Sequence, residues 1–227
     1  MIRAAVAGGL IVLFACAVWA KDAQIGATSM TLPAPSNFCE MQESNAADAR
    51  MLTVVQGMIA GKNQLLAMSA DCNQLKDWRT GKRKLLDDFA QYQTLISMMN
   101  TELPIPPEQA VKEICASLRA EGEKMLSGMM PDIKARAQEL MKNVKVNEMR
   151  FAGVLAEEPL ACYAGLLQKF RTEVGTDKTQ VGVFVTTILK GKVVYYYLFT
   201  PYVNEDTIVN LLAKHKANYA KLVAANR

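Results

Sequence analysis

The stretch that decides the fold is a pair of apolar runs, VGVFVTTIL over Val181–Leu189 and KVVYYYLFT over Lys192–Thr200, joined by Lys190-Gly191. Valine, isoleucine, threonine and aromatic residues favour strands, and a two-residue connection with glycine in second place is typical of a hairpin turn. In this hairpin Leu189 pairs with Lys192. Both of its faces are apolar, so we expect helices to cover the sheet on both sides.

The apolar periodicity predicts further elements on either side of the hairpin. Strands are expected over 37–41, 64–70, 86–98, 147–154 and 160–172, and helices over 45–60, 71–79, 107–144 and from Asn204 onward. Pro131 should kink or split the long helix, because proline removes a backbone hydrogen bond and clashes with the preceding turn.

These elements predict an α+β fold, with a mostly antiparallel sheet flanked by helices on both faces. Residues 36–227 are expected to form a single domain of this kind. The polar residues 21–35, with Pro33 and Pro35, read as an extended linker into it.

The first residues have the pattern of an export signal. Arg3 is followed by the apolar stretch Ala4–Phe14, and Val18-Trp19-Ala20 is a small-x-small cleavage site, so residues 1–20 are predicted to be removed. A second possibility is a lipoprotein signal, Leu13-Phe14-Ala15-Cys16, with Cys16 lipidated. Either way the protein is expected to be exported by a bacterium, to the periplasm or beyond. No later segment is long enough to cross a membrane.

Four cysteines remain after such a cleavage: Cys39, Cys72, Cys115 and Cys162. An even number in an oxidising compartment predicts disulfides. We favour Cys39–Cys72, because both lie at the edges of predicted elements. Cys115 either pairs with Cys162 or stays a buried free thiol on the apolar stripe of the long helix.

Composition excludes several classes of function. The chain has 227 residues, of which 51% are hydrophobic and 21% charged, with a formal net charge of +4. This apolar content argues against disorder, and the mild basic excess is not typical of a protein that binds nucleic acid. A single histidine leaves few routes to a metal centre, and no cofactor site is predicted. Met125 and Met129 follow the apolar helix face, which indicates packing rather than Cu(I) binding.

Two places remain as candidate sites. His215 lies on the apolar stripe of the last helix, so we expect it to be buried and bonded to a neighbour, the alternative being an exported hydrolase assembled around it. Trp78 and Arg79 could line a ligand cleft with an aromatic ring and a guanidinium. The lysines of the last helix indicate a solvated face, or weak contact with an anionic membrane surface.

The order of elements resembles the PsbP-like α/β/α sandwich family, as does the ending of hairpin, Pro201-Tyr202 and helix. The stretch NQLLAMSADCNQLKDWR over 63–79 is similar to small secreted alphaproteobacterial proteins of unassigned function. The resemblance implies a non-enzymatic binding or accessory role. Together these observations predict an exported, non-catalytic protein whose partner is an envelope protein or a small ligand.

Overall fold

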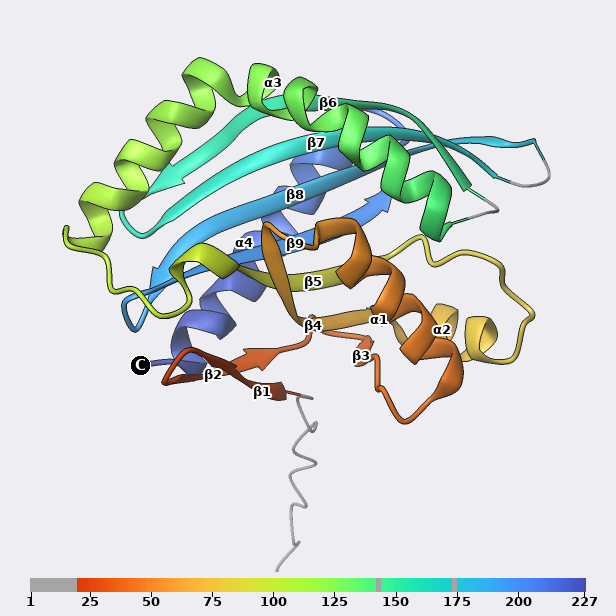
Figure 1. Cartoon of the computed structure of the whole chain (residues 1–227), viewed down its shortest axis with the longest axis horizontal. Helices are drawn as coiled ribbons and strands as arrows, with labels where there is room; N and C mark the ends of the chain where they lie inside the picture. The colour runs from red at the N-terminus through yellow and green to blue at the C-terminus, as the bar shows by residue number, and fades with distance from the viewer. Residues whose placement is uncertain (1–19, 142–143, 173–174) are drawn as a thin grey trace, which may run out of the picture.

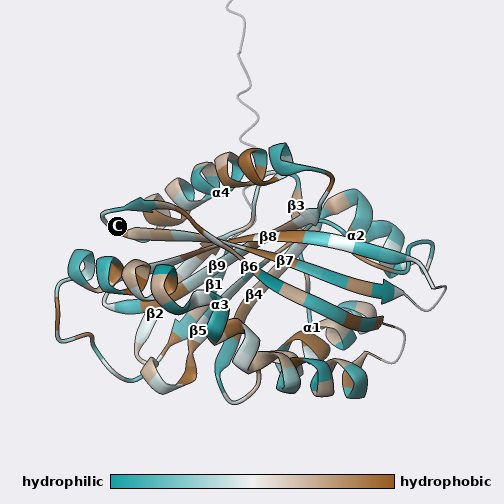
Figure 2. Cartoon of the chain, turned by 90° about the horizontal axis from the view of Figure 1, so that it is seen from above, coloured by the Kyte–Doolittle hydropathy of each residue, from teal (hydrophilic) through white to brown (hydrophobic). Residues whose placement is uncertain are grey.

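The computed structural model describes residues 20–141, 144–172 and 175–227, and it has three layers. In Figure 2 the large sheet lies between α4 on one side and α1 with α3 on the other. Cys16 and nearly all of the predicted export signal lie outside the described residues.

In the described chain, three short strands come first, helices and strands then alternate up to α3, and a run of four strands and a last helix follow. The elements are β1 Ala20–Ile25, β2 Thr28–Pro33, β3 Phe38–Glu40, α1 Ala46–Ile59, β4 Asn63–Asp71, α2 Cys72–Arg79, β5 Phe89–Leu95, a 3₁₀ turn η1 Ile96–Met98, α3 Pro107–Leu140, β6 Val144–Glu158, β7 Ala161–Thr172, β8 Asp177–Leu189, β9 Lys192–Pro201 and α4 Glu205–Ala225.

The large sheet is antiparallel throughout, with the strand order β3-β4-β5-β9-β8-β7-β6. The hairpin β8–β9 has the predicted register, with Leu189 opposite Lys192. The predicted fold class is therefore confirmed: an α+β protein with an antiparallel sheet and helices on both faces. Figure 1 shows α3 and α1 in front of the sheet and α4 behind it.

On the face toward α4, large apolar side chains are sealed from solvent. Tyr163, Tyr196 and Leu198 of the sheet belong to one core with Leu211 and Leu222 of α4, and none of them is more than 4% exposed. On the other face, Ile188 and Val193 pack with residues of α3. The two apolar faces of the hairpin are thus covered by different helices.

Residues 21–35 are not the extended linker that the sequence predicts. They contain a second hairpin, β1–β2, with Gly26 at its turn in the left-handed region (φ 59°). Ile25, Met30 and Leu32 are buried in the α4-side core, and the Asn226 side chain bonds both backbone groups of Thr31. Three buried apolar residues in such short strands do not produce a clear strand periodicity, whereas the two prolines favour a linker.

The predicted strand over 86–98 is shorter in the structure, where β5 begins at Phe89. The Gln74 side chain accepts hydrogen bonds from the backbone N–H groups of Asp87 and Asp88, at 2.9 and 3.2 Å. These bonds hold residues 80–88 as a loop, because the backbone groups that a strand would use are already bonded to α2.

Pro131 does not split helix α3, which continues through it as one element and arches over the sheet (Figure 1). Met125 and Met129 are 49% and 46% exposed, so the prediction that they pack is wrong. The buried positions of this part of the helix are Gly122 and Leu126 instead.

Two disulfides join elements across the fold. Cys39–Cys72 ties β3 to the start of α2, and Cys115–Cys162 ties α3 to β7, with Cα–Cα distances of 4.9 and 5.6 Å. Both pairs agree with the predicted pairing, and Cys115 is not a free thiol.

We predict that protein secreted without residues 1–20 has no free thiol at these four positions when counted under denaturing conditions, and four after reduction. Replacing Cys115 and Cys162 by alanine should lower the free energy of unfolding by about 4 kcal/mol, because the bridge closes a long loop in the unfolded chain. Denaturant titration measures the loss. Four reactive thiols before reduction would contradict both bridges.

Candidate functional site

An apolar cavity of about 230 Å³ lies under α1, on the face of the sheet away from α4. Its roof is α1, one side wall is the loop 80–88, the other is the start of β6 with the end of β7, and its floor is formed by β4, β5, β8 and β9. Val54 and Met58 point into it from α1, Leu86 from the loop, and Phe89 and Phe199 from the floor. Small-molecule sites are typically concave and mostly apolar with a few polar groups, and this cavity has that character.

Local contacts hold α1 in place as the roof. The Asn45 side chain caps its N-terminus by accepting from Ala47 N–H at 3.0 Å. At its C-terminus, Arg136 of α3 donates to the carbonyl of Ala60 at 2.6 Å. Gly57 lies directly against Leu140, because a Cβ there would be 2.6 Å from the leucine Cδ1. Helix α1 therefore rests on the end of α3 and leaves space above the floor strands.

The floor of the cavity is a stacked pair of rings. Phe89 of β5 and Phe199 of β9 have centroids 4.6 Å apart, across the seam between the two strands. Gly182 of β8 makes room for this arrangement, since a Cβ there would be 2.5 Å from Cε1 of Phe199. The glycine lets the ring lie flat on the sheet, which leaves volume above it.

Three glutamines supply neutral polar groups of the cavity wall. Gln168 and Gln180 bond each other through their amides, and Gln180 also donates to the carbonyl of Asp87 at 2.9 Å. Gln91 accepts from the amide of Gln93 at 2.8 Å. Sequence reasoning missed this site. The available signal was the pattern FAQYQ at the start of β5, which places two glutamines on one face of an interior strand.

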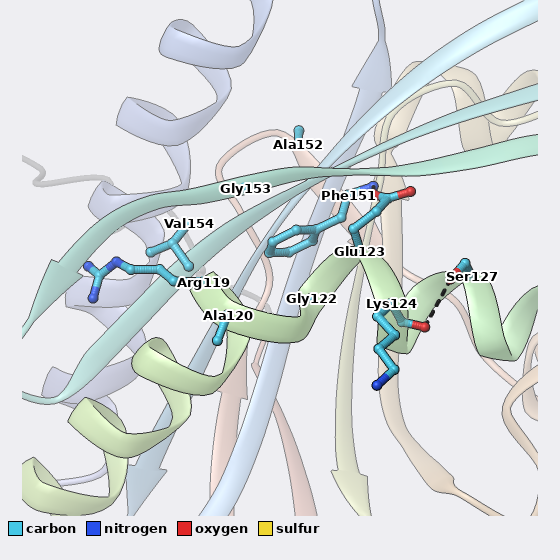
Figure 3. A pocket seen from close by; sticks show the side chains of 10 residues that line it. All are labelled: Arg119, Ala120, Gly122, Glu123, Lys124, Ser127, Phe151, Ala152, Gly153 and Val154. Carbon is cyan, nitrogen blue, oxygen red and sulfur yellow. Dashed lines mark hydrogen bonds between the residues drawn. The ribbon is translucent and has the colours of Figure 1, made fainter.

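A second hollow lies between α3 and the edge strand β6 (Figure 3). The Phe151 ring of β6 packs directly against Gly122 of α3, since a Cβ on this glycine would be 2.5 Å from the ring. The Glu123 carboxylate accepts from Phe151 N–H at 2.9 Å, and Arg119 pairs with Glu157 at 2.7 Å. These groups bind one another, so this hollow is the seam by which α3 protects the edge of the sheet.

Trp78 and Arg79 do not form the predicted ligand cleft. The guanidinium of Arg79 donates to the fully buried carboxylate of Asp48, with Nε 3.0 Å from Oδ1, and to the carbonyl of Glu40 at 3.2 Å. The hydrogen bond to Asp48 raises the pKa of Arg79 above its usual value. Trp78 packs against the cluster of Met41 and Leu75. The pair stabilises the junction of α1, α2 and β3.

His215 is buried as predicted, at 0% exposure. Its Nε2 donates to the carbonyl of Tyr196 at 2.9 Å, and its ring lies against those of Tyr163 and Tyr196. Burial lowers its pKa to about 4. No carboxylate, hydroxyl or thiol of the described residues bonds to its ring, so the open cleft required by the hydrolase hypothesis is not present around it.

The lysines of α4 contact neighbouring side chains. Lys216 pairs with Glu158 at 2.8 Å, Lys221 donates to Ser36 at 2.7 Å, and the ammonium of Lys214 lies 4.8 Å from the centroid of the Phe38 ring. Contact of this face with a membrane surface stays a prediction. Within 20–141, 144–172 and 175–227, no helix is long and apolar enough to span a membrane, and no group of three or more His, Cys, Asp or Glu side chains is placed to hold a metal ion.

No protein family matches the chain, and no curated protein matches it. Solved structures similar to it include the Ran-binding protein Mog1p of Saccharomyces cerevisiae, at 9% identity over 92% of this chain and 93% of that one, with a TM-score of 0.32. A mutant of protein Mog1 is similar at 10% identity over 91% and 92%, with a TM-score of 0.32. Likeness at this level carries no argument about function.

We predict that Arg79→Ala lowers the free energy of unfolding by about 2–4 kcal/mol, because it leaves the Asp48 carboxylate buried without its partner. Arg79→Lys, which keeps the charge, should lose less. Chemical denaturation followed by circular dichroism measures both. An Arg79→Ala protein as stable as the wild type would contradict this structural role.

The buried histidine predicts a pH dependence of stability. Between about pH 6.5 and 4 the unfolded chain protonates His215 while the folded chain does not, so stability falls as the pH falls through this window. The contribution of this group is about 3 kcal/mol. In the His215→Gln variant, the free energy of unfolding lost between pH 7 and pH 4 should be smaller by this amount. Denaturant titration at each pH measures it. Equal losses in the two proteins would rule the prediction out.

Proposed function

We propose that this protein is an exported, non-catalytic binding protein that holds a small, mostly apolar ligand in the cavity under α1. The observation that carries the proposal is the cavity itself, lined by α1, the loop 80–88, the strands β6 and β7 and the Phe89–Phe199 floor. Well-packed cores contain few voids larger than a water molecule, so a space of about 230 Å³ with apolar walls and convergent amides favours a binding role.

Export is supported by two independent features. The first 20 residues have the pattern of a bacterial signal, with the alternative of lipidation at Cys16. The two disulfides favour an oxidising compartment, because cytosolic proteins rarely keep such bridges. The periplasm satisfies both. Lipidation would anchor the same binding protein to a membrane and would not change the cavity.

The non-catalytic part of the proposal rests on the sequence and on the one histidine. The resemblance to the PsbP-like family implies a binding or accessory role. A hydrolase centred on His215 has less support, because the imidazole is enclosed by tyrosine rings and bonded to a backbone carbonyl. Sealed from solvent, this group cannot serve as a base toward a substrate.

The methionines of the chain allow a direct test. We expect 2-heptanone and 2-methyl-1-heptene, added to protein labelled with ¹³C at the methionine methyls, to give saturable shifts of Met51, Met58 and Met68, which line the cavity. Met125 and Met129, exposed on α3, are internal controls and should not respond. The measurement is a two-dimensional ¹H–¹³C spectrum at each ligand concentration.

A matched pair of variants locates the binding. Val54→Trp places an indole in the cavity from α1 and should weaken both compounds by about tenfold or more. Thr53→Trp makes the same change at the exposed neighbouring position and should leave binding unchanged. If neither compound shifts the cavity methionines, or if the two variants behave alike, the proposed function is wrong.

A further inference from the structure

One amide donor in the cavity, Nε2 of Gln91, has no hydrogen-bond acceptor within the part of the chain that the structure describes. Asn63 Nδ2 donates to Gln93 Oε1 at 2.8 Å, and Gln93 Nε2 donates to Gln91 Oε1 at 2.8 Å. Each amide thus donates to the next in a chain of three, and the last donor is Nε2 of Gln91. Among the described residues, no group accepts a hydrogen bond from this nitrogen.

The burial of Gln91 makes this nitrogen notable. The residue is only 8% exposed. Its amide nitrogen is nevertheless not among the side-chain atoms that are fully buried without a hydrogen-bond partner, so it keeps some accessible surface. It lines the cavity between the aromatic floor and Met68. Because this nitrogen keeps some accessible surface, water can occupy it until a ligand replaces the water, and a chain of aligned amides polarises its last member further. The end of the chain is therefore a strong donor that opens into an apolar space.

The other two glutamines of the cavity serve as an internal comparison. The amide nitrogen of Gln168 bonds Gln180, and that of Gln180 bonds the carbonyl of Asp87. Of the three, Gln91 alone keeps an unused amide nitrogen within the part of the chain that the structure describes. The amide nitrogens of two of these glutamines therefore donate to protein groups, and that of the third, Gln91, does not.

The charged side chains along the cavity wall limit the class of ligand that can bind there. Among the described residues that line it, Lys169 is the one cationic side chain, and its ammonium pairs with Glu148 at 3.1 Å. An ionised carboxylate taken into an apolar space needs a counter-charge, and this lysine is already engaged. A neutral acceptor needs only a donor, which Gln91 provides.

We propose that Gln91 is the specificity-determining residue of the cavity, and that the ligand class is small apolar molecules with one neutral carbonyl oxygen, such as ketones, aldehydes or esters. This inference rests on the proposed function, because it uses the same cavity. The carbonyl oxygen accepts the hydrogen bond from Nε2 of Gln91, and the hydrocarbon part of the ligand packs over the aromatic floor.

The test compares two compounds of nearly the same shape, 2-heptanone and 2-methyl-1-heptene, which differ by C=O against C=CH₂. Their dissociation constants are measured from the methionine methyl shifts in the wild type and in Gln91→Met, an apolar replacement of similar length. The ratio of the two constants, ketone over alkene, cancels the different hydrophobicity of the compounds. We expect this ratio to rise about threefold to tenfold in Gln91→Met, the value of one hydrogen bond.

A second measurement needs no variant. The carbonyl stretch of 2-heptanone bound to the wild type should absorb at lower frequency than in an alkane solvent, because it accepts a hydrogen bond. If both compounds bind but the ratio is unchanged in Gln91→Met, or the bound ketone absorbs as in an alkane, the role of Gln91 is overturned while the binding function stands. If neither compound binds, the proposed function fails first and the inference fails with it.

Discussion

The pairing of β9 with β5 is the interaction on which the rest of the structure depends. It joins β3–β4–β5 from the first half of the chain to β6–β9 from the second, so that one continuous sheet forms. Ring stacking reinforces this seam on both faces, with Phe89 against Phe199 on one and Tyr92 against Tyr196 on the other, each at 4.6 Å between centroids. Without the seam, neither face would be wide enough for the helices to cover.

The two faces of this seam differ because different helices cover them. On the Tyr196 face, α4 lies across the sheet and its buried His215 and Leu222 leave the core closed. On the Phe199 face, the first half of α3 covers the far strands and is fixed by Cys115–Cys162. Helix α1 sits over β4 and against the end of α3. Under α1, the flat Phe89 and Phe199 rings leave volume above the floor strands, and the cavity is the consequence.

Features set by neighbouring residues could be predicted from the sequence, and features set by distant ones could not. The Lys190-Gly191 turn fixes the register of β8 and β9, and Asn204 caps α4 as expected. The β5–β9 seam joins residues about a hundred positions apart, with no signal in local periodicity. The role of Arg79 could not be predicted for the same reason, since Asp48, the group that binds it, lies 31 positions away. The cavity depends on that same distant packing, so the sequence offered only the glutamines of β5.

The contacts that hold the roof of the cavity differ in kind from those that hold its floor, as expected of a site that must admit a ligand. The disulfides hold β3 to α2 and α3 to β7, and neither of them ties down α1. The roof is held by non-covalent contacts, among them the ion pair of Asp48 with Arg79 at one end, the bond from Gln56 Nε2 to the carbonyl of Asn63, and the bond from Arg136 to Ala60 at the other end. Such contacts can open locally at a free energy far below that of global unfolding. The floor, by contrast, is part of the central sheet, where the donor of Gln91 is fixed in place by the amide chain behind it. A rigid floor thus holds the polar group in one position, which selective binding requires, while the roof has no covalent tie that would prevent a ligand from entering.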